Sequence, residues 1–348
     1  MPNPARDKKQ DPRWCMKEHE NVREYTYYPE KSTALEKIKK KLKIEVVREQ
    51  DRELEFDLIG CDTSLVNAFR RILISEVPSM AIEQVYIVNN TSILQDEVFA
   101  HRMGLIPLRA DARLFEFPPQ NKRPNGEIGD QDTLRYELKV TCTKNPQAPK
   151  LSTLPDDLYR NSKIYSKDIK WVPIGRQADM FPRGTEQFGM VDEDILIAKL
   201  RPGHEIHAYM HAVKGVGKDH AKFSPVALAT YRLMPGIELL KSIRNADADL
   251  LQKCFSPGVI EVVEQQTSSG EKNREARVAN ARYDNCSRNV FYHEQLKNCV
   301  ELTRIRDHFI FTVETVGALP SSVLFIEAVK VLKNKCRTFL AEMDGVNK

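Results

Sequence analysis

The residues that come nearest to a metal-binding set in this 348-residue chain are His204, His207, His211 and His220. Successive side chains of a strand point to opposite faces, so only His207 and His211 would share one. Two ligands do not complete a zinc site, which takes three or four protein ligands. We therefore predict no metal ligands and no cofactor.

A second candidate is the turn Lys214-Gly-Val-Gly-Lys218, which looks like a phosphate-binding loop. The P-loop pattern G-x-x-x-x-G-K-[ST] is not met, because Asp219 follows the lysine and the first glycine is too close. We interpret the segment as a tight basic turn that is available to touch a neighbouring subunit.

Acid/base chemistry has little support in the sequence. The adjacent carboxylates Asp96-Glu97 and Asp156-Asp157 would point in different directions on a helix, so neither is a ready acid/base pair. His101 could position a reacting group, but no serine or cysteine nucleophile motif accompanies it. We predict no catalytic residues, and hence a protein that is not itself an enzyme.

Composition describes a mixed-charge globular chain. The net charge of +4 comes from 53 basic and 49 acidic residues, and this balance does not favour a stand-alone nucleic-acid-binding protein. No apolar run approaches the roughly 20 residues of a membrane span, and the first thirty residues do not resemble a signal peptide. The 7 cysteines include no C-x-x-C pair, so neither a disulfide framework nor a zinc site is expected.

The elements that would position functional side chains start with a helix predicted from Ser64 to Val77. Asp62 or Thr63 can accept a backbone N–H at its start, and Pro78 ends it. Asn67 and the residues at 70, 71 and 75 fall largely outside the apolar face. That face carries five side chains at helical spacing: Leu65, Phe69, Ile72, Leu73 and Val77.

Strands flank this helix in the sequence. Leu42, Ile44 and Val46 alternate with polar residues as in a half-buried strand. A second run places Leu54, Phe56 and Leu58 on one face and Glu53, Glu55 and Asp57 on the other, and a third run follows at 85–88. Strand, strand, helix and strand in succession indicate an α+β unit.

The middle of the chain is rich in strand signals, and the end is helical. A short helix is expected at 96–103 and a loop at 116–133, whereas 240–300 is polar without a strong pattern. Pro320 opens a long helix with apolar residues at helical spacing: Phe325, Val329, Leu332, Cys336, Phe339, Leu340 and Met343. Strands are expected at 134–142, 170–173, 195–200, 205–213 and 304–314.

Several motifs in this chain resemble those of the RNA polymerase alpha-subunit family. The helix matches the alpha motif at Asn67, Ala68, Arg70, Arg71, Ile72, Leu73, Ser75, Pro78 and Ala81. Further matching blocks are 89–107, 200–203, 218–226 and 307–318. The chain looks most like the alpha-like subunits shared by eukaryotic RNA polymerases I and III, because its central region contains only Cys142, whereas the polymerase II counterpart has a zinc-binding cysteine cluster.

The resemblance implies an α+β fold with a dimerisation domain that is discontinuous in sequence. An N-terminal tail would occupy 1–39. The dimerisation domain would combine 40–90 with 227–348, and a strand-rich domain, 91–226, would be inserted between them.

The resemblance also implies a function. The chain would be a non-catalytic assembly subunit of DNA-directed RNA polymerases I and III, which transcribe rRNA, tRNA and 5S RNA, and it would be found in the nucleus (nucleolus and nucleoplasm). It would form a heterodimer with a smaller alpha-like subunit and dock the two largest subunits and small zinc-binding subunits, with no direct DNA contact and no membrane. Its partner-binding residues would be Leu65, Phe69, Arg70, Arg71, Ile72, Leu73, Glu76, Phe325, Val329, Leu332, Cys336 and Phe339. The alternatives are the corresponding subunit of RNA polymerase II and a stand-alone nucleic-acid-binding protein.

Overall fold

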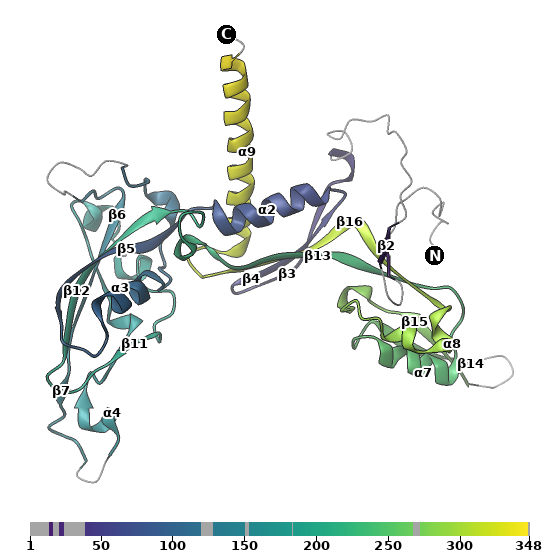
Figure 1. The fold of residues 1–348 in the computed structure, drawn as a ribbon, viewed down its shortest axis with the longest axis horizontal. Coiled ribbons are helices and arrows are strands. Elements are labelled where there is room, and N and C mark those ends of the chain that lie inside the picture. The colour runs from purple at the N-terminus through teal and green to yellow at the C-terminus, as the bar shows by residue number, and fades with distance from the viewer. Residues whose placement is uncertain are drawn as a thin grey trace. The chain divides into compact units, whose positions relative to one another are not determined.

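The computed structural model describes residues 14–16, 21–23, 39–119, 128–149, 153–182, 184–266 and 272–346. The chain divides into two compact units (Figure 1). Unit 1 comprises Met1–Val47, Glu55–Val66 and Tyr231–Phe311. Unit 2 comprises Arg48–Leu54, Asn67–Thr230 and Thr312–Lys348.

Unit 1 is built on a sheet with the strand order β2-β1-β16-β4-β3, in which β13 also pairs with β16. The predicted face of β4 is confirmed, because Leu54, Phe56 and Leu58 are buried and the Phe56 ring stacks on Phe311 at 5.2 Å. The strands are β1 (Trp14–Met16), β2 (Asn21–Arg23), β3 (Lys43–Gln50), β4 (Glu53–Ile59), β13 (Val226–Leu239) and β16 (Val300–Thr315).

Strands from distant parts of the sequence are thus neighbours in this sheet. β4 lies beside β16, and β1, from the segment predicted to be an N-terminal tail, pairs antiparallel with β16 through Trp14 and Arg304. Most of the remaining predicted tail lies outside the described residues.

The first predicted strand exists, but its predicted burial is wrong. β3 occupies one end of the strand order, and all eight of its residues are exposed, including Ile44 and Val46. The alternation of apolar and polar residues correctly predicted a strand. It could not show whether another part of the chain covers that strand, and none of the described residues buries it.

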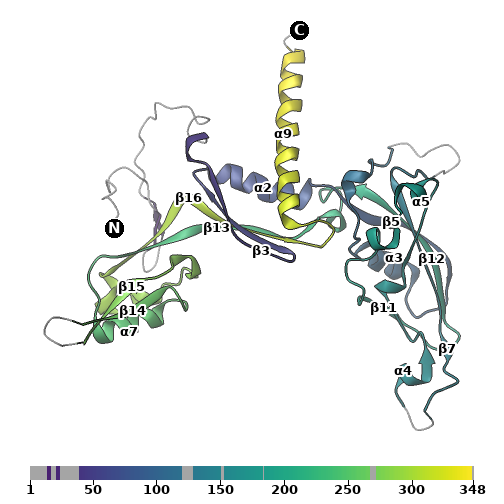
Figure 2. The same ribbon diagram turned by 180° about the vertical axis from the view of Figure 1, so that it is seen from behind.

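The polar stretch 240–300 contains a small folded module rather than unpatterned chain (Figure 2). The helix α7 (Asn245–Cys254) packs on the hairpin of β14 (Ile260–Gln266) and β15 (Lys272–Val278), and α8 (Glu294–Lys297) follows. Its core includes Leu251, Val259, Phe291 and Leu296. Hydrophobic periodicity did not predict this core, because its helices and strands are short and its apolar residues are scattered along the sequence.

A buried ion cluster in unit 1 contains Asp57, which lies on the predicted polar face of β4 and is 5% exposed. The Arg282 guanidinium donates to both carboxylate oxygens of Asp57 at 2.8 and 2.9 Å and to Glu55 at 2.8 Å. His308 Nε2 lies 2.8 Å from Asp57 Oδ2. Burial tends to raise the pKa of Asp57, but hydrogen bonds from Arg282 and His308 outweigh it and hold that pKa below its usual value.

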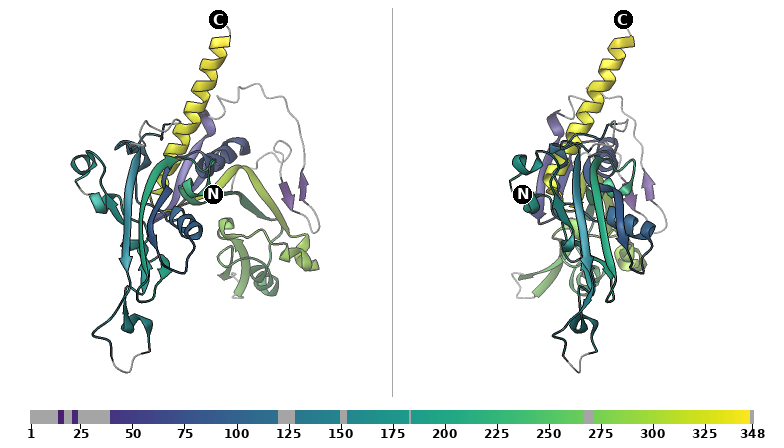
Figure 3. Two further views of the ribbon diagram at one scale, coloured as in Figure 1. Left: turned by 60° about the vertical axis from the view of Figure 1, so that its left-hand side comes forward. Right: turned by 90° about the vertical axis from the view of Figure 1, so that its left-hand side faces the viewer.

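Unit 2 contains a four-stranded antiparallel sheet with the order β10-β6-β12-β5 (Figure 3). These strands confirm the predicted strand-rich character of the middle of the chain. One face of the sheet is packed with apolar side chains such as Leu134, Leu138 and Met210. Bounds are β5 (Ser79–Asn90), β6 (Thr133–Thr141), β10 (Lys170–Val172) and β12 (Glu205–Gly215).

Smaller elements complete unit 2. The predicted short helix is α3 (Asp96–Gly104), and Gly203 adopts φ +94° in the predicted turn before β12. Part of the predicted loop at 116–133 lies outside the described residues. The remaining elements are β7 (Thr143–Lys144), α4 (Pro155–Leu158), β8 (Tyr159–Arg160), β9 (Lys163–Tyr165), α5 (Gln177–Met180), α6 (Gly184–Gln187) and β11 (Leu196–Lys199). The two longer helices are α2 (Thr63–Ser75) and α9 (Ser321–Val346).

Candidate partner-binding surface

Helix α2 begins where the sequence predicts. The carboxylate of Asp62 accepts the backbone N–H of Ser64 at 2.9 Å, which satisfies one of the free donors of the first turn. This hydrogen bond, together with one from the Ser64 side chain, lowers the pKa of Asp62. The helix ends at Ser75, two residues before the predicted end at Val77, because the N–H groups of Glu76 and Val77 both turn back to the Ile72 carbonyl.

The basic turn at 214–218 contacts the end of α2 within this chain. The N–H of Lys218 donates to the Ser75 carbonyl at 2.8 Å, so an unpaired helix-terminal acceptor is satisfied. A Cβ added at Gly217 would lie 2.2 Å from the Ile74 carbonyl oxygen. Glycine is therefore needed at 217 for this close approach.

The predicted apolar residues of α2 differ in their burial. Ile72 and Leu73 are buried, as is Val77 just beyond the helix, whereas Leu65 and Phe69 are half-buried. The prediction missed Val66, which is completely buried. Its position seven residues before Leu73 is the helical-spacing signal that could have found it.

The charged candidates near α2 have different surroundings. Arg70 Nε donates to Asn67 Oδ1 within the same helix at 3.1 Å. The Glu76 carboxylate binds Lys335 of α9 at 2.8 and 2.9 Å, so this candidate has a partner inside the chain. Arg71 is exposed, and within the described part of the chain no hydrogen bond or ion pair of its guanidinium is recorded.

The first turns of α9 pack against the rest of unit 2. Leu324 and Ala328 are completely or almost completely buried, and the half-buried ring of Phe325 lies 5.3 Å from the ring of Phe69 on α2. The structure therefore brings together two candidates that are far apart in the sequence.

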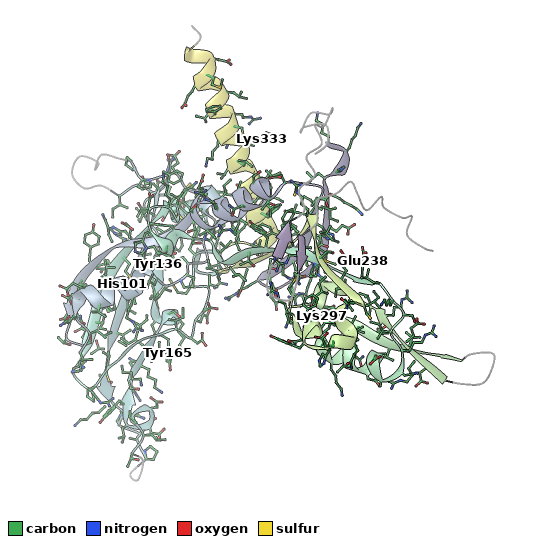
Figure 4. The ribbon with its side chains drawn as sticks, turned by 45° about the vertical axis from the view of Figure 1, so that its right-hand side comes forward. His101, Tyr136, Tyr165, Glu238, Lys297 and Lys333 are labelled. Atoms are coloured by element: carbon green, nitrogen blue, oxygen red, sulfur yellow. The ribbon has the colours of Figure 1, made fainter. Side chains whose placement is uncertain are left out.

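Beyond Ala328 the same helix is largely exposed. Phe339 retains 62% and Leu340 60% of their accessible surface, and the C-terminal end of α9 extends away from the other described elements of unit 2 in Figures 1 to 3. Lys333, labelled in Figure 4, lies on this half. Here the term α9 stripe denotes six residues at helical spacing: Val329, Leu332, Cys336, Phe339, Leu340 and Met343.

The stripe adds residues to the predicted site. Leu340 and Met343 share its face and are exposed, although they were not among the predicted partner-binding residues. Ile326, also missed, is 53% exposed. A contiguous exposed apolar face of this length is unusual on a monomer and typical of an interaction surface.

The residues first considered for chemistry do not converge. His207 Nε2 lies 3.0 Å from Glu137, the ring of His211 packs against Tyr86, and His220 Nδ1 accepts the Lys222 N–H. No cluster of three or more His, Cys, Asp or Glu in the described ranges could hold a metal ion. None of the helices described here has the length and apolar composition needed to cross a membrane.

The family model for the RNA polymerase Rpb3/Rpb11 dimerisation domain matches residues 55–336. The chain is 54% identical over 310 residues to mouse DNA-directed RNA polymerases I and III subunit RPAC1, covering 89% of this chain and 87% of that protein. It is 46% identical over 301 residues to the Saccharomyces cerevisiae protein of the same name (86% and 87% covered). Against Dictyostelium discoideum RNA polymerase II subunit rpb3, identity is 30% over 320 residues (90% and 98% covered).

Proposed function

The chain belongs to the RNA polymerase Rpb3/Rpb11 dimerisation-domain family, and on that premise we propose that it is the non-catalytic, alpha-like assembly subunit shared by DNA-directed RNA polymerases I and III. Higher identity to the polymerase I and III relatives than to the polymerase II relative favours this assignment. The subunit contributes binding surfaces to the polymerase and no active site of its own.

The observation that carries the proposal is the exposed α9 stripe. Its large apolar side chains remain in contact with water although the helix is regular to Val346. Complete burial of a leucine or phenylalanine side chain stabilises a complex by about 1.5–3 kcal/mol. Covering Phe339, Leu340 and Met343 together would therefore supply several kcal/mol for association.

The proposed occupant of this stripe is a smaller alpha-like subunit, with which the chain forms a heterodimer. The Phe69–Phe325 contact places α2 beside the start of α9, so the half-buried residues of both helices can extend one surface. Of the charged candidates, Arg71 is free in the described structure to meet a carboxylate of a larger subunit, whereas Glu76 would first have to exchange Lys335.

A discontinuous dimerisation domain remains part of the proposal. It would combine 40–90 with 227–348, and 91–226 would be an inserted domain. The neighbouring positions of β4 and β16 in one sheet support the pairing of the two separated segments. The compact units divide the chain differently, because they cut through β4, β13 and β16.

The wider assembly follows from the same premise. The heterodimer would dock the two largest polymerase subunits and small zinc-binding subunits in the nucleus, in both nucleolus and nucleoplasm. Immunoprecipitation from nuclear extract followed by mass spectrometry should recover subunits common to polymerases I and III. Recovery of polymerase II-specific subunits instead would contradict the assignment.

Co-expression tests the heterodimer directly. Alone, the full chain should self-associate or precipitate because the stripe is uncovered, and the smaller alpha-like subunit should convert it to a soluble 1:1 complex on size-exclusion chromatography. A chain that is monomeric at all concentrations and ignores that subunit would refute the proposal.

A further inference from the structure

Arg52, in the turn between β3 and β4, contacts three separate parts of unit 2. Its carbonyl oxygen accepts the Thr315 N–H at 2.9 Å and the Ser321 hydroxyl at 2.6 Å, at the end of β16 and the first residue of α9. Its guanidinium donates to both carboxylate oxygens of Asp192, at 2.6 and 3.3 Å. Asp192 lies in the strand-rich part, before β11, so a single residue connects that part to the start of α9.

Gly317 closes the same junction from the other side. Its φ is +107°, and an added Cβ would lie 2.4 Å from Val191 Cγ1 and 3.4 Å from Arg52 Nε. The Thr315 hydroxyl accepts the Gly317 N–H at 3.1 Å and donates to the Leu319 carbonyl at 2.7 Å. The link between β16 and α9 is therefore held tightly against the strand-rich part, where a side chain at 317 does not fit.

A second contact supports this junction further along α9. Arg113 lies 3.8 Å from Glu327 of α9 and is itself held by Asp111 at 2.7 Å. The two contacts that α9 makes here, through Ser321 with Arg52 and through Glu327 with Arg113, fall within the first two turns of the helix. After Ala328 the helix is joined to the rest of unit 2 by the partly exposed ion pair of Lys335 with Glu76, at 2.8 Å. The buried side chains of α9 all lie in its first turns, so these turns determine where its exposed half points.

We propose that Arg52, Asp192 and Gly317 form a joint that sets the direction in which α9 leaves the strand-rich part, and so positions the α9 stripe for its partner. This inference rests on the proposed function of the stripe. Phe339 lies 18 residues beyond Ser321, about 27 Å along a helix that rises 1.5 Å per residue. A change in direction of about 10° at the joint would displace Phe339 by about 5 Å, comparable to one helical turn.

The joint can be altered without unfolding the chain. The side chains of Arg52 and Asp192 are 47% and 37% exposed, and ion pairs of this exposure contribute little to stability. A matched control exists on the same hairpin, where Arg48 pairs with Glu53 at 2.6 Å and with comparable exposure. Both residues of that pair lie on the hairpin itself, Arg48 in β3 and Glu53 in β4.

The experiment measures the distance between spin labels in the full chain. Non-canonical amino acids at Lys139 of β6 and Lys333 of α9, both exposed, avoid labelling the native cysteines. The unsubstituted joint should give one narrow distance distribution. Arg52→Ala, Asp192→Ala and Gly317→Ala should each lose that narrow peak, and the charge exchange Arg52→Asp with Asp192→Arg should restore it. Arg48→Ala should leave the peak unchanged.

Binding of the smaller alpha-like subunit provides the second readout. Arg52→Ala should weaken binding although every residue of the α9 stripe is intact, and the charge exchange should restore it. The proposed joint would be refuted if Arg52→Ala kept the narrow peak or if the charge exchange restored neither the peak nor binding. It would also be refuted if Arg48→Ala broadened the distance distribution as much as Arg52→Ala. A chain with the narrow peak that never binds the subunit would instead contradict the proposed function.

Discussion

The two halves of α9 share one helix and one apolar pattern, yet they differ in what covers them. From Ser321 to Ala328 the apolar side chains pack within the chain, with Leu324 at 1% exposure. From Val329 to Met343 the pattern continues, and apart from the half-buried Val331 and Leu332 the apolar side chains are exposed. The first half stabilises the fold, and the second half has the character of a surface that is completed by another chain.

The ion pairs of the chain also differ in how far they are buried. Arg282 is buried against Glu55 and Asp57, whereas Lys335 and Glu76 form an ion pair whose side chains are 55% and 30% exposed. Removing one partner of a buried pair leaves an uncompensated charge, but removing one partner of an exposed pair leaves a hydrated one. Burial therefore predicts which substitutions affect folding.

The largest expected effect is that of Arg282→Ala. It should lower the free energy of unfolding by about 3–5 kcal/mol, because the Asp57 carboxylate would remain buried without its main partner. Urea unfolding monitored by circular dichroism measures this change. Lys335→Ala is the control and should cost less than about 1 kcal/mol. Similar losses of unfolding free energy in Arg282→Ala and Lys335→Ala would contradict the expected difference between buried and exposed ion pairs.

Next in size is Leu324→Ala in the packed half of α9. Removing this buried side chain should cost about 3 kcal/mol through lost burial and a cavity. Leu340→Ala removes the same atoms from the exposed half and should change the stability of the isolated chain by no more than about 0.5 kcal/mol. The comparison fails if the two variants unfold at the same urea concentration.

A smaller effect is expected from pH. Because the folded-state pKa of Asp57 is lowered, its contribution to stability is complete above the unfolded value near 4 and is lost as the pH falls through the folded value. Urea midpoints measured from pH 7 to 3 should therefore fall less steeply for Asp57→Asn than for the unsubstituted chain. Parallel curves would contradict this account.

Asp284 is a second buried carboxylate, and its pKa is shifted in the opposite direction to that of Asp57. It is buried, and that burial raises its pKa against the opposing effect of the Cys286 N–H, while its Oδ1 has no hydrogen-bond partner among the described residues. Burial thus disfavours the charged form in the folded chain relative to the unfolded chain. Asp284→Asn should leave stability at pH 7 unchanged or increase it, in contrast to Asp57→Asn.

Local patterns predicted much of the fold because they depend on nearby residues. Asp62 begins α2, Leu54, Phe56 and Leu58 form a buried face, and Gly203 takes the positive φ of its turn. The resemblance added the family and with it the function. The pairing of Arg282 with Asp57 was not predictable in this way, because it joins a polar segment to a strand far away in the sequence.

The candidate site was predictable only in part for a related reason. Helical spacing identified the faces of α2 and α9, but it could not separate the buried Leu324 from the exposed Leu340, since both fit an amphipathic helix. It also gave no indication that Glu76 would bind Lys335 or that Arg52 would reach Asp192. Such contacts depend on tertiary structure.

The most direct test of the central claim is the dissociation constant of the complex with the smaller alpha-like subunit. Phe339→Asp with Leu340→Asp places two charges in the stripe, and Asn334→Asp with Thr338→Asp places the same charges on the opposite face of the helix. Our account predicts that the first pair abolishes heterodimer formation while the second leaves it within a few-fold of the unsubstituted chain. Equal binding by the two double variants would contradict it.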